Sequence, residues 1–326
     1  MNEIILAADL GGTNLRMAAI TPSGEILHRV KVRTPSDDGR ESILSTLSDG
    51  FKQLEQDLKQ TGKVIAFGAA VPATIDASRG HILNSPNLPV LNNFNFAEYF
   101  SDLLKVPVLL ENDANAAAIG ENWKGATKGF QDSICVTLGT GVGGGLILGG
   151  RIHRGIDGTA GEVGHITVEP DGIPCGCGSQ GCIEQYASAR AISRFAHELM
   201  PRFPESVLHS DLDITPLDVY NAGVKRDALA LEVFKLMGRY LGIALSGLIN
   251  VLNPEAIVIG GGASAGWDLF IDSLRKEVDY RSFPEPAKRV KLLKSALGDD
   301  AGILGAAFLA SKELVQPQIP IIQTTV

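Results

Sequence analysis

Residues 4–28, IILAADLGGTNLRMAAITPSGEILH, and residues 134–155, ICVTLGTGVGGGLILGGRIHRG, follow one rhythm of strand, Gly-Thr turn, strand, glycine turn and strand. Short apolar runs separated by GGTN and PSG predict three antiparallel strands joined by tight turns. The turn LGGT at residues 10–13 corresponds to LGTG at residues 138–141, about 128 residues later, which is a domain-sized interval. We therefore predict a duplicated α/β fold with two lobes.

Apolar spacing in the rest of the chain predicts further strands and helices. Strands are expected over residues 64–71, 106–112, 255–261 and 289–295. Helices are expected over residues 39–60, 98–105, 185–200, 227–252 and 267–278, and others start at Asp113 and after Asp300. Such alternation is typical of a mixed sheet flanked by helices.

The composition narrows the class of protein. The chain has 326 residues with 44% hydrophobic content, enough for two cores, and a net charge of −8. This acidic balance argues against a nucleic-acid partner and against adhesion to a membrane. The start MNEIILAADLGG lacks the features of a secretory signal, and no stretch has 18 consecutive apolar residues. We expect a cytoplasmic protein that acts on small molecules.

Three of the four cysteines, Cys175, Cys177 and Cys182, lie within eight residues, downstream of His165. A disulfide, a redox pair and a metal site are the alternatives. Three clustered cysteines cannot all pair with one another, and Cys135 lies in an apolar stretch where a buried free thiol is expected. In a reducing compartment, three thiolates with one imidazole favour a closed structural zinc site over free thiols.

The glycine-rich turns suit a phosphate-binding role. Residues 139–144 and 260–265 match the dinucleotide fingerprint or its variant, but a strand follows the first and no acidic residue closes the second. Backbone N–H groups of the paired Gly-Thr turns are an alternative cradle for phosphate oxygens. Asp9, at the end of the first strand, would then hold a magnesium ion or its water. Ordinary hairpin turns remain the other interpretation.

Several acidic and polar residues are candidates for catalysis and ligand binding. Asn112 and Asp113 lie where a strand passes into a helix, and Asp113 either caps that helix or acts as a general base toward a substrate hydroxyl. Glu162 and His165 form Glu-x-x-His, and Glu184 follows the last cysteine. Such side chains suit a ligand rich in hydroxyl groups.

Taken together, LAADLGGTNLR, LLENDANAAA, LGTGVGGGLIL, GTAGEVGHITV, CGCGSQGCIEQYAS, VIGGGAS and GDDAGILGAA resemble the ROK family of sugar kinases and related repressors. The resemblance spans residue 4 to about residue 310, and C-x-C-G-x-x-G-C-x-E is matched completely by residues 175–184. It implies an actin-like ATPase (ribonuclease H-like) fold, with ATP and magnesium bound in a cleft between two lobes. The expected lobes are residues 1–115 with about 300–326, and residues 116–299 with the zinc loop.

The resemblance also implies residue roles. The implied catalytic base is Asp113. The implied sugar contacts are Asn112, Asp113, Glu162, His165 and Glu184. The implied zinc ligands are His165, Cys175, Cys177 and Cys182. The implied nucleotide and magnesium residues are Asp9, Gly11, Gly12, Thr13, Gly139, Thr140, Gly141, Gly260, Gly261 and Gly262.

The implied reaction is ATP-dependent phosphorylation of a hexose at the 6-hydroxyl. The segment PDGIPCGCGSQGCIEQYAS is most similar to bacterial glucokinases, which implies glucose as substrate. Kinases for N-acetylmannosamine, N-acetylglucosamine, fructose and allose share nearly all of these motifs, and some members use polyphosphate. Ala73 and Thr74 depart from the usual Val-Pro-Gly-Pro-Val-Asp pattern, which leaves the preferred sugar open.

A sugar sensor without catalysis is the alternative from another class. Repressor members carry a helix-turn-helix ahead of the first phosphate turn, whereas eight residues precede Asp9 here, so a DNA-binding repressor is not expected. The family resemblance also implies a homodimer or higher homo-oligomer.

Overall fold

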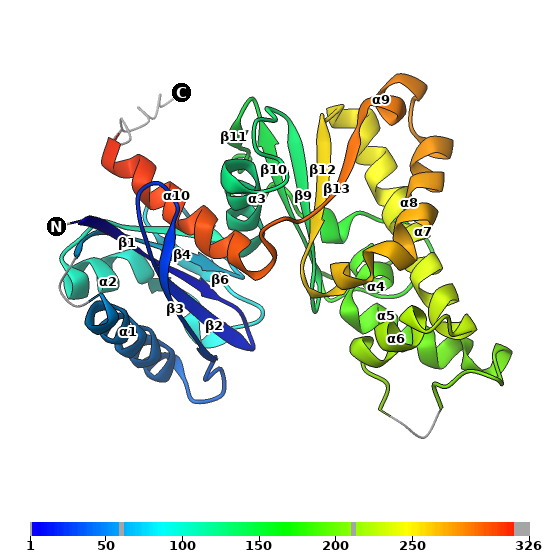
Figure 1. Ribbon diagram of the computed structural model, residues 1–326, viewed down its shortest axis with the longest axis horizontal. Coiled ribbons are helices and arrows are strands. Elements are labelled where there is room, and N and C mark those ends of the chain that lie inside the picture. Colours follow the sequence, from blue (N-terminus) through cyan, green and yellow to red (C-terminus); the bar gives the residue numbers. More distant parts are fainter. Residues whose placement is uncertain (1, 59–61, 210–212, 316–326) are drawn as a thin grey trace. The chain divides into compact units, whose positions relative to one another are not determined.

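A computed structural model describes residues 2–58, 62–209 and 213–315. The chain forms two compact units, each with its own core (Figure 1). The described part of the first unit takes in residues 2–58 and 62–124, the short segment Ile156–Gly158 and residues 300–315. The second unit takes in Gly125–Gly155 and Thr159–Asp299.

The first unit is built on a five-stranded sheet in the order β3-β2-β1-β4-β8. Its strands are β1 (Asn2–Leu10), β2 (Asn14–Ile20), β3 (Ile26–Arg33), β4 (Gly62–Val71) and β8 (Val108–Asn112). β1, β2 and β3 are antiparallel neighbours, as predicted, whereas β4 is parallel to both β1 and β8. Ile4 to Ala8 are buried without alternation because both faces of the sheet are covered, which explains the continuous apolar run.

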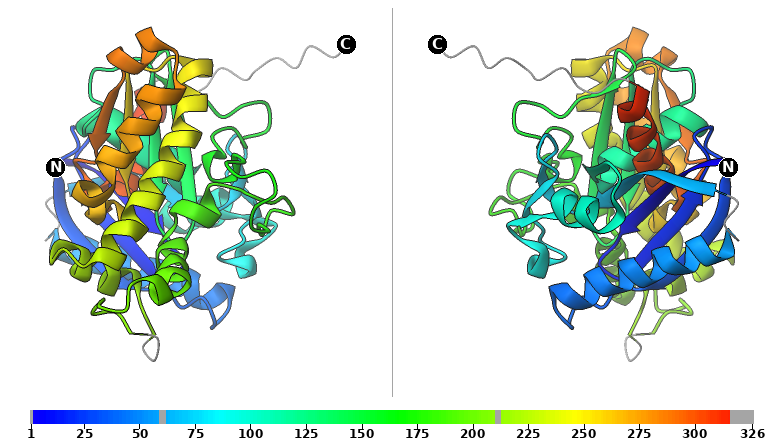
Figure 2. Two further views of the ribbon diagram at one scale, coloured as in Figure 1. Left: turned by 90° about the vertical axis from the view of Figure 1, so that its right-hand side faces the viewer. Right: turned by 90° about the vertical axis from the view of Figure 1, so that its left-hand side faces the viewer.

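Successive residues of β4 face opposite helical layers. Phe67 joins the core under α1 (Arg40–Asp57), which lies across the sheet in the right-hand view of Figure 2. The next residue, Gly68, faces α10 (Ala301–Val315), where a Cβ would collide with the backbone of Ala306. A helix on each face of the sheet therefore completes this unit.

Smaller elements fill the rest of the first unit. They are β5 (Thr74–Asp76), β6 (His81–Asn84), β7 (Phe94–Asn95), α2 (Phe96–Leu104) and a 3-10 turn at Pro89–Leu91. Residues 59 and 60 of the helix expected over residues 39–60 lie outside the described residues.

The boundary expected at residue 115 falls inside α3 (Asp113–Lys124), and the first unit continues to the end of this helix. α3 and α10 lie so close that a Cβ at Gly120 would collide with the carbonyl of Ala301, and one at Gly305 with that of Ala116. This contact keeps the whole of α3 in the first unit. Residues 316–326, which the expected first lobe included, lie outside the described residues.

The second unit repeats the same sheet. Its strand order is β11-β10-β9-β12-β13, with antiparallel β9, β10 and β11 and parallel β9, β12 and β13. The strands are β9 (Ser133–Leu138), β10 (Val142–Leu148), β11 (Arg151–Ile152), β12 (Ala256–Gly260) and β13 (Lys291–Lys294). Each strand occupies the place of its counterpart in the first unit, so the predicted duplication is confirmed.

The two units differ in how the third strand connects to the fourth. The first unit uses α1, whereas the second has a long insertion that carries the cysteine loop. The described helices of that insertion are α4 (Glu184–Ala187), α5 (Ala189–Leu199), α6 (Pro216–Val224) and α7 (Ala228–Leu252). Beyond β12 come α8 (Trp267–Arg281) and α9 (Pro284–Arg289). The remaining 3-10 turns are Val163–His165, Met200–Arg202, Gly262–Gly266 and Gly298–Asp300.

The single helix expected over residues 185–200 is wrong. α4 and α5 meet at Ser188, whose backbone is extended and whose hydroxyl accepts a hydrogen bond from the N–H of Ala191 at 3.2 Å, so that Ser188 starts a new helix. α6 was not expected, although Thr215 and Asp218 form a capping box at its start. Across the described residues, none of the helices combines the length and apolar character needed to span a membrane.

Candidate active site and cysteine cluster

The turn from β8 to α3 carries Asn112 and Asp113. Asn112 Oδ1 accepts hydrogen bonds from the backbone N–H groups of Ala114 at 3.0 Å and Asn115 at 3.1 Å, which makes Asn112 the N-cap of α3. Its Nδ2 donates to the carbonyl of Ala73 at 3.3 Å. Asp113 is the first helical residue, half-buried, and its Oδ1 also accepts the N–H of Ala114 at 2.9 Å, whereas the N–H of Asn115 goes to Asn112.

A buried polar pair holds this turn. Glu111 is 1% exposed and Asn115 is 2% exposed. Glu111 Oε1 accepts the N–H of Asn112 at 3.0 Å and the Nδ2 of Asn115 at 3.1 Å. Burial of a carboxyl group is costly without such partners. The motif ENDAN contains both residues, but sequence reasoning had not given either of them a role.

The first Gly-Thr turn connects β1 to β2. Gly11 N donates to the carbonyl of Asn14 at 2.9 Å, and Thr34 on the segment after β3 donates through Oγ1 to the carbonyl of Gly11 at 2.6 Å. Among the described residues, the N–H groups of Gly12 and Thr13 have no hydrogen-bond partner in the protein. The turn thus presents two adjacent donors that could bind an anion.

Asp9 lies on the face of β1 that meets α10. Its Oδ2 is 3.4 Å from Nη1 of Arg16 on β2. A Cβ at Gly302 in the first turn of α10 would lie 3.2 Å from Asp9 Cγ, so the start of the helix approaches the carboxylate closely. One carboxylate beside a turn with two unpartnered N–H groups fits Mg²⁺, which usually takes one or two carboxylates with phosphate oxygens and water.

The second Gly-Thr turn connects β9 to β10. Gly139 N donates to the carbonyl of Gly141 at 2.9 Å. Within the described part of the chain, the N–H groups of Thr140 and Gly141 have no partner in the protein. These positions align with the two adjacent donors of the first turn, so the repeat extends to the free N–H groups. The two turns are therefore equivalent positions of the repeat.

Gly260, Gly261 and Gly262 lie beside the second turn. Gly261 has a φ of 81° and packs on Leu138, the last residue of β9, so closely that a Cβ would meet its backbone at 2.5 Å. Ser264 Oγ donates to the carbonyl of Gly261 at 2.7 Å and fixes the bend. A Cβ at Gly262 would meet nothing within 4 Å, so this glycine borders open space.

His165, Cys175, Cys177 and Cys182 come together as one cluster, with their ligand atoms all within 4.8 Å of one another. Cys177 Sγ is 3.7 Å from Cys182 Sγ, and Cys175 Sγ is 3.7 Å from His165 Nδ1. A tetrahedral Zn²⁺ with Zn–S bonds of about 2.3 Å places its sulfur ligands about 3.8 Å apart. The donor set and its spacing therefore fit zinc.

Protonation of the thiols bears on the same question. Burial, together with the thiols of Cys177 and Cys175, raises the pKa of Cys182 to about 12. A hydrogen bond from the backbone N–H of Ser179 lowers the pKa of Cys177. Zinc binds thiolates, so an ion in this cluster would displace the proton that Cys182 otherwise keeps at neutral pH.

The predicted sugar contacts of the second unit surround the cluster. His165 directs Nδ1 toward Cys175, while its Nε2 lies 3.9 Å from Oε2 of Glu162. Glu184 lies two residues beyond Cys182, and its Oε2 accepts the backbone N–H of Val142 at 3.1 Å. Sequence reasoning missed this last contact, because no local pattern connects residue 142 to residue 184.

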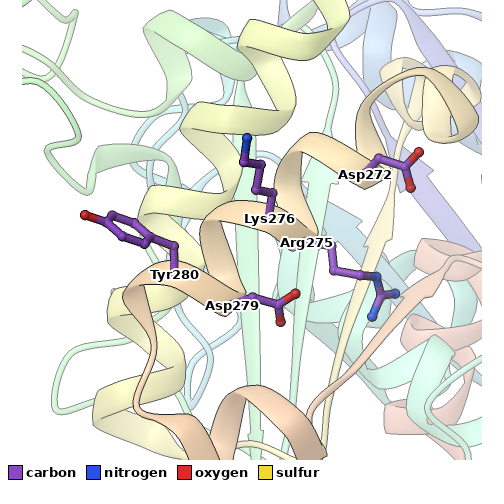
Figure 3. Close-up of a pocket in the computed structure, with 5 residues that line it drawn as sticks. All are labelled: Asp272, Arg275, Lys276, Asp279 and Tyr280. Atoms are coloured by element: carbon purple, nitrogen blue, oxygen red, sulfur yellow. The ribbon is translucent and has the colours of Figure 1, made fainter.

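The predicted site residues thus fall into two groups. The first unit holds Asp9, Gly11, Gly12, Thr13, Asn112 and Asp113. The second unit holds Glu162, His165, Glu184, the cysteines and both remaining glycine turns. A surface pocket elsewhere in the second unit is lined by residues from one helix only, α8, and contains none of the predicted site residues (Figure 3).

Comparison with known proteins identifies one matching family and several similar proteins. A family model described as ROK family matches residues 5–313. The chain is 38% identical to a glucokinase of Halalkalibacterium halodurans over 94% of this chain and 95% of that protein. It is similar to the crystal structure of a ROK family glucokinase from Streptomyces griseus in complex with glucose and AMPPNP, with a TM-score of 0.82, 35% identity, and coverage of 95% of this chain and 99% of that one. It is also 30% identical to a xylose repressor of Caldicellulosiruptor bescii over 95% of this chain and 79% of that protein.

Proposed function

The chain belongs to the ROK family, and on that premise we propose that it transfers the γ-phosphoryl group of ATP to the 6-hydroxyl of a hexose, with glucose as the preferred substrate. The observation that carries the proposal is that Asn112, the residue before Asp113, accepts the N–H groups at the start of α3. Asn112 caps the helix, so the capping role that could have explained Asp113 belongs to its neighbour.

Asp113 is the general base in this proposal. It accepts the proton of the 6-hydroxyl as that oxygen forms a bond to the γ-phosphorus and the bond from this phosphorus to the oxygen bridging to ADP breaks. Such a base contributes a factor of about 10² to 10⁴ to the rate. Its position at the first turn of a helix also stabilises the carboxylate before it takes the proton.

Each unit supplies candidate groups for sugar hydroxyls. Asn112 keeps one N–H of its amide beyond the one donated to Ala73, and that group is free to reach a hydroxyl. Glu162 and Glu184 supply carboxylate oxygens, and His165 is held beside Glu162. Paired donors and acceptors of this kind reject analogues that lack the matching hydroxyl.

Each Gly-Thr turn offers donors for phosphate oxygens of ATP. The N–H groups of Gly12 and Thr13, and those of Thr140 and Gly141, are the donors, and Gly260–Gly262 border the nucleoside. Asp9 would hold Mg²⁺ or one of its waters, and the ion would supply positive charge that neutralises the phosphate oxygens.

Zinc has a structural role in this proposal. His165, Cys175, Cys177 and Cys182 would hold one Zn²⁺ in a closed site, which offers no position for a reactive water. The cluster then fixes Glu184, two residues beyond Cys182, and Glu162, three residues before His165. Its contribution is to order the loop that presents these carboxylates.

The test is an assay of sugar-dependent ADP release with purified protein, Mg²⁺ and ATP. The sugar panel is glucose, mannose, fructose, N-acetylglucosamine and N-acetylmannosamine. We expect glucose to give the highest kcat/KM. A higher value with an N-acetylhexosamine or with fructose would reassign the substrate within the same reaction, and polyphosphate in place of ATP would test the donor.

A sugar sensor that does not phosphorylate its ligand is the second candidate, because the chain is also similar to a xylose repressor. Binding of a sugar in calorimetry, with no ADP release from any sugar of the panel, would favour it. The place of Asp113 directly after the capping residue Asn112, at the first position of α3, favours the kinase.

Two further expectations belong to this proposal. The enzyme acts in the cytoplasm, where ATP is available and thiols stay reduced. It forms a homodimer or higher homo-oligomer, which light scattering of the purified protein would test.

A further inference from the structure

The segment that follows the last cysteine is bonded to both ends of the second Gly-Thr turn. Glu184 Oε2 accepts the N–H of Val142 at 3.1 Å, immediately after the turn. Ala189 N donates to the carbonyl of Gly139 at 2.9 Å, at the start of the turn. The turn that presents Thr140 and Gly141 is thus held between two contacts from residues 184–189.

The carboxylate approaches the turn so closely that a side chain at residue 141 would displace it. A Cβ at Gly141 would collide with Oε2 of Glu184, whereas a Cβ at Gly139 would meet nothing within 4 Å. Gly141 is absent from the residues with positive φ, so its backbone conformation is open to any residue. Gly141 therefore leaves the space that the carboxylate of Glu184 occupies.

The same segment is continuous with the cysteine cluster. Gln185 Nε2 donates to Cys175 Sγ at 3.7 Å, and Arg194 Nη2 donates to the carbonyl of Gln185 at 2.5 Å. Tyr186 OH accepts the N–H of Ile173 at 2.9 Å and fastens the cysteine loop to α4. The position of Glu184 is thus set from both sides, by the cluster and by the helix that it starts.

We propose that Glu184 is a positioning residue for the nucleotide as well as a sugar contact. Oε2 holds the second Gly-Thr turn in the conformation that presents its N–H groups to phosphate. Oε1 has no hydrogen bond among the described residues and is left for a sugar hydroxyl. The inference rests on the proposed function, since ATP and a hexose are its two ligands.

One carboxylate then serves two ligands, which makes their affinities interdependent. A sugar hydroxyl on Oε1 restricts the rotation of the side chain and so orders the turn for phosphate. Thermodynamic linkage requires the reciprocal effect, by which the nucleotide raises the affinity for the sugar by the same factor.

The test measures the affinity for Mg²⁺-AMPPNP by calorimetry, first without any sugar, in the zinc-replete protein. Glu184→Ala should weaken binding about ten- to hundredfold, the range expected for loss of one hydrogen bond to a charged acceptor. Glu184→Gln keeps a carbonyl oxygen for Val142 and should restore nucleotide affinity while still weakening glucose binding. Glu285→Gln, an exposed change on α9, is the matched control.

A double-mutant cycle tests whether Glu184 and Gly141 are in direct contact. Gly141→Ala should weaken nucleotide binding on its own, because the new Cβ displaces the carboxylate. In the Glu184→Ala protein the same change should cost much less, because the colliding oxygen is gone. Additive effects of the two changes would contradict a direct contact.

Unchanged nucleotide affinity in Glu184→Ala, with zinc content retained, would overturn the inference. Failure of the proposed function has a different signature, namely no ADP release from wild-type protein with any sugar. The sugar-free affinity for Mg²⁺-AMPPNP remains measurable in that case, so the two failures are distinguishable.

Discussion

Asn115 donates a hydrogen bond from Nδ2 to Oε1 of Glu111 at 3.1 Å, and the same oxygen accepts the N–H of Asn112. Glu111→Leu would leave the buried amide of Asn115 and the half-buried N–H of Asn112 without this acceptor, at a cost of about 1–3 kcal/mol for a fully buried group. We expect a lower free energy of unfolding and a lower kcat, because the turn that carries Asp113 loses its support. Glu111→Gln keeps an acceptor oxygen and should recover most of both. Urea unfolding and the kinase assay provide the measurements, and a fully active Leu variant would contradict the role.

Asp113→Asn should reduce kcat by about 10² to 10⁴ while leaving glucose affinity within a few-fold. The free energy of unfolding should stay nearly constant, because Asn112 provides the cap. Calorimetric binding and ADP release separate the two effects. Asp102→Asn, an exposed change on α2, is the control. Unchanged turnover in Asp113→Asn would remove Asp113 from the catalytic role.

Asn112→Ala should destabilise the first unit by about 1 kcal/mol, the usual effect of losing an N-cap. Asp113→Ala should cost much less, which is the reverse of what a capping aspartate would give. Urea unfolding of the two variants side by side checks this order. Equal destabilisation by both changes would mean that the cap is shared.

Metal analysis of the purified protein should find one zinc per chain. Cys182→Ser should lose the metal and weaken glucose affinity about tenfold, because Glu184 is then no longer held. Cys135→Ala changes a cysteine outside the cluster, and this variant should keep its zinc and its glucose affinity. A zinc-free wild-type protein with normal glucose affinity would refute the structural role of the cluster.

Acid stability should depend in part on the capping box of α6. Hydrogen bonds from the hydroxyl and backbone N–H of Thr215 lower the pKa of Asp218. A carboxylate with a lowered folded pKa adds stability above its unfolded pKa of about 3.9, and this is lost as pH falls through the folded value. The free energy of unfolding of Asp218→Asn should therefore differ less between pH 7 and pH 3 than that of the wild-type protein. An unchanged difference would contradict the contribution of the capping box to acid stability.

The duplicated sheet could be predicted because paired turns and apolar runs are local signals. The N-cap of α3 could not be predicted, since Asn112 and Asp113 are both good capping residues. Only the residue at which β8 ends decides which of the two precedes the helix. Ser188 lies within a stretch whose apolar residues keep helical spacing, so the sequence did not indicate the break between α4 and α5. The contact from Glu184 to Val142 depends on the tertiary fold and leaves no trace in the local sequence.

The return of α10 to the first unit has a consequence for biosynthesis. Gly68 and Ala116 meet Ala306 and Gly305, so the first unit to leave the ribosome lacks one of its two helical layers until the end of the chain is made. β9 likewise waits for β12, on the far side of the long insertion. Both units should therefore reach the native state only after synthesis ends, and premature termination before residue 301 should yield chains that aggregate or are degraded.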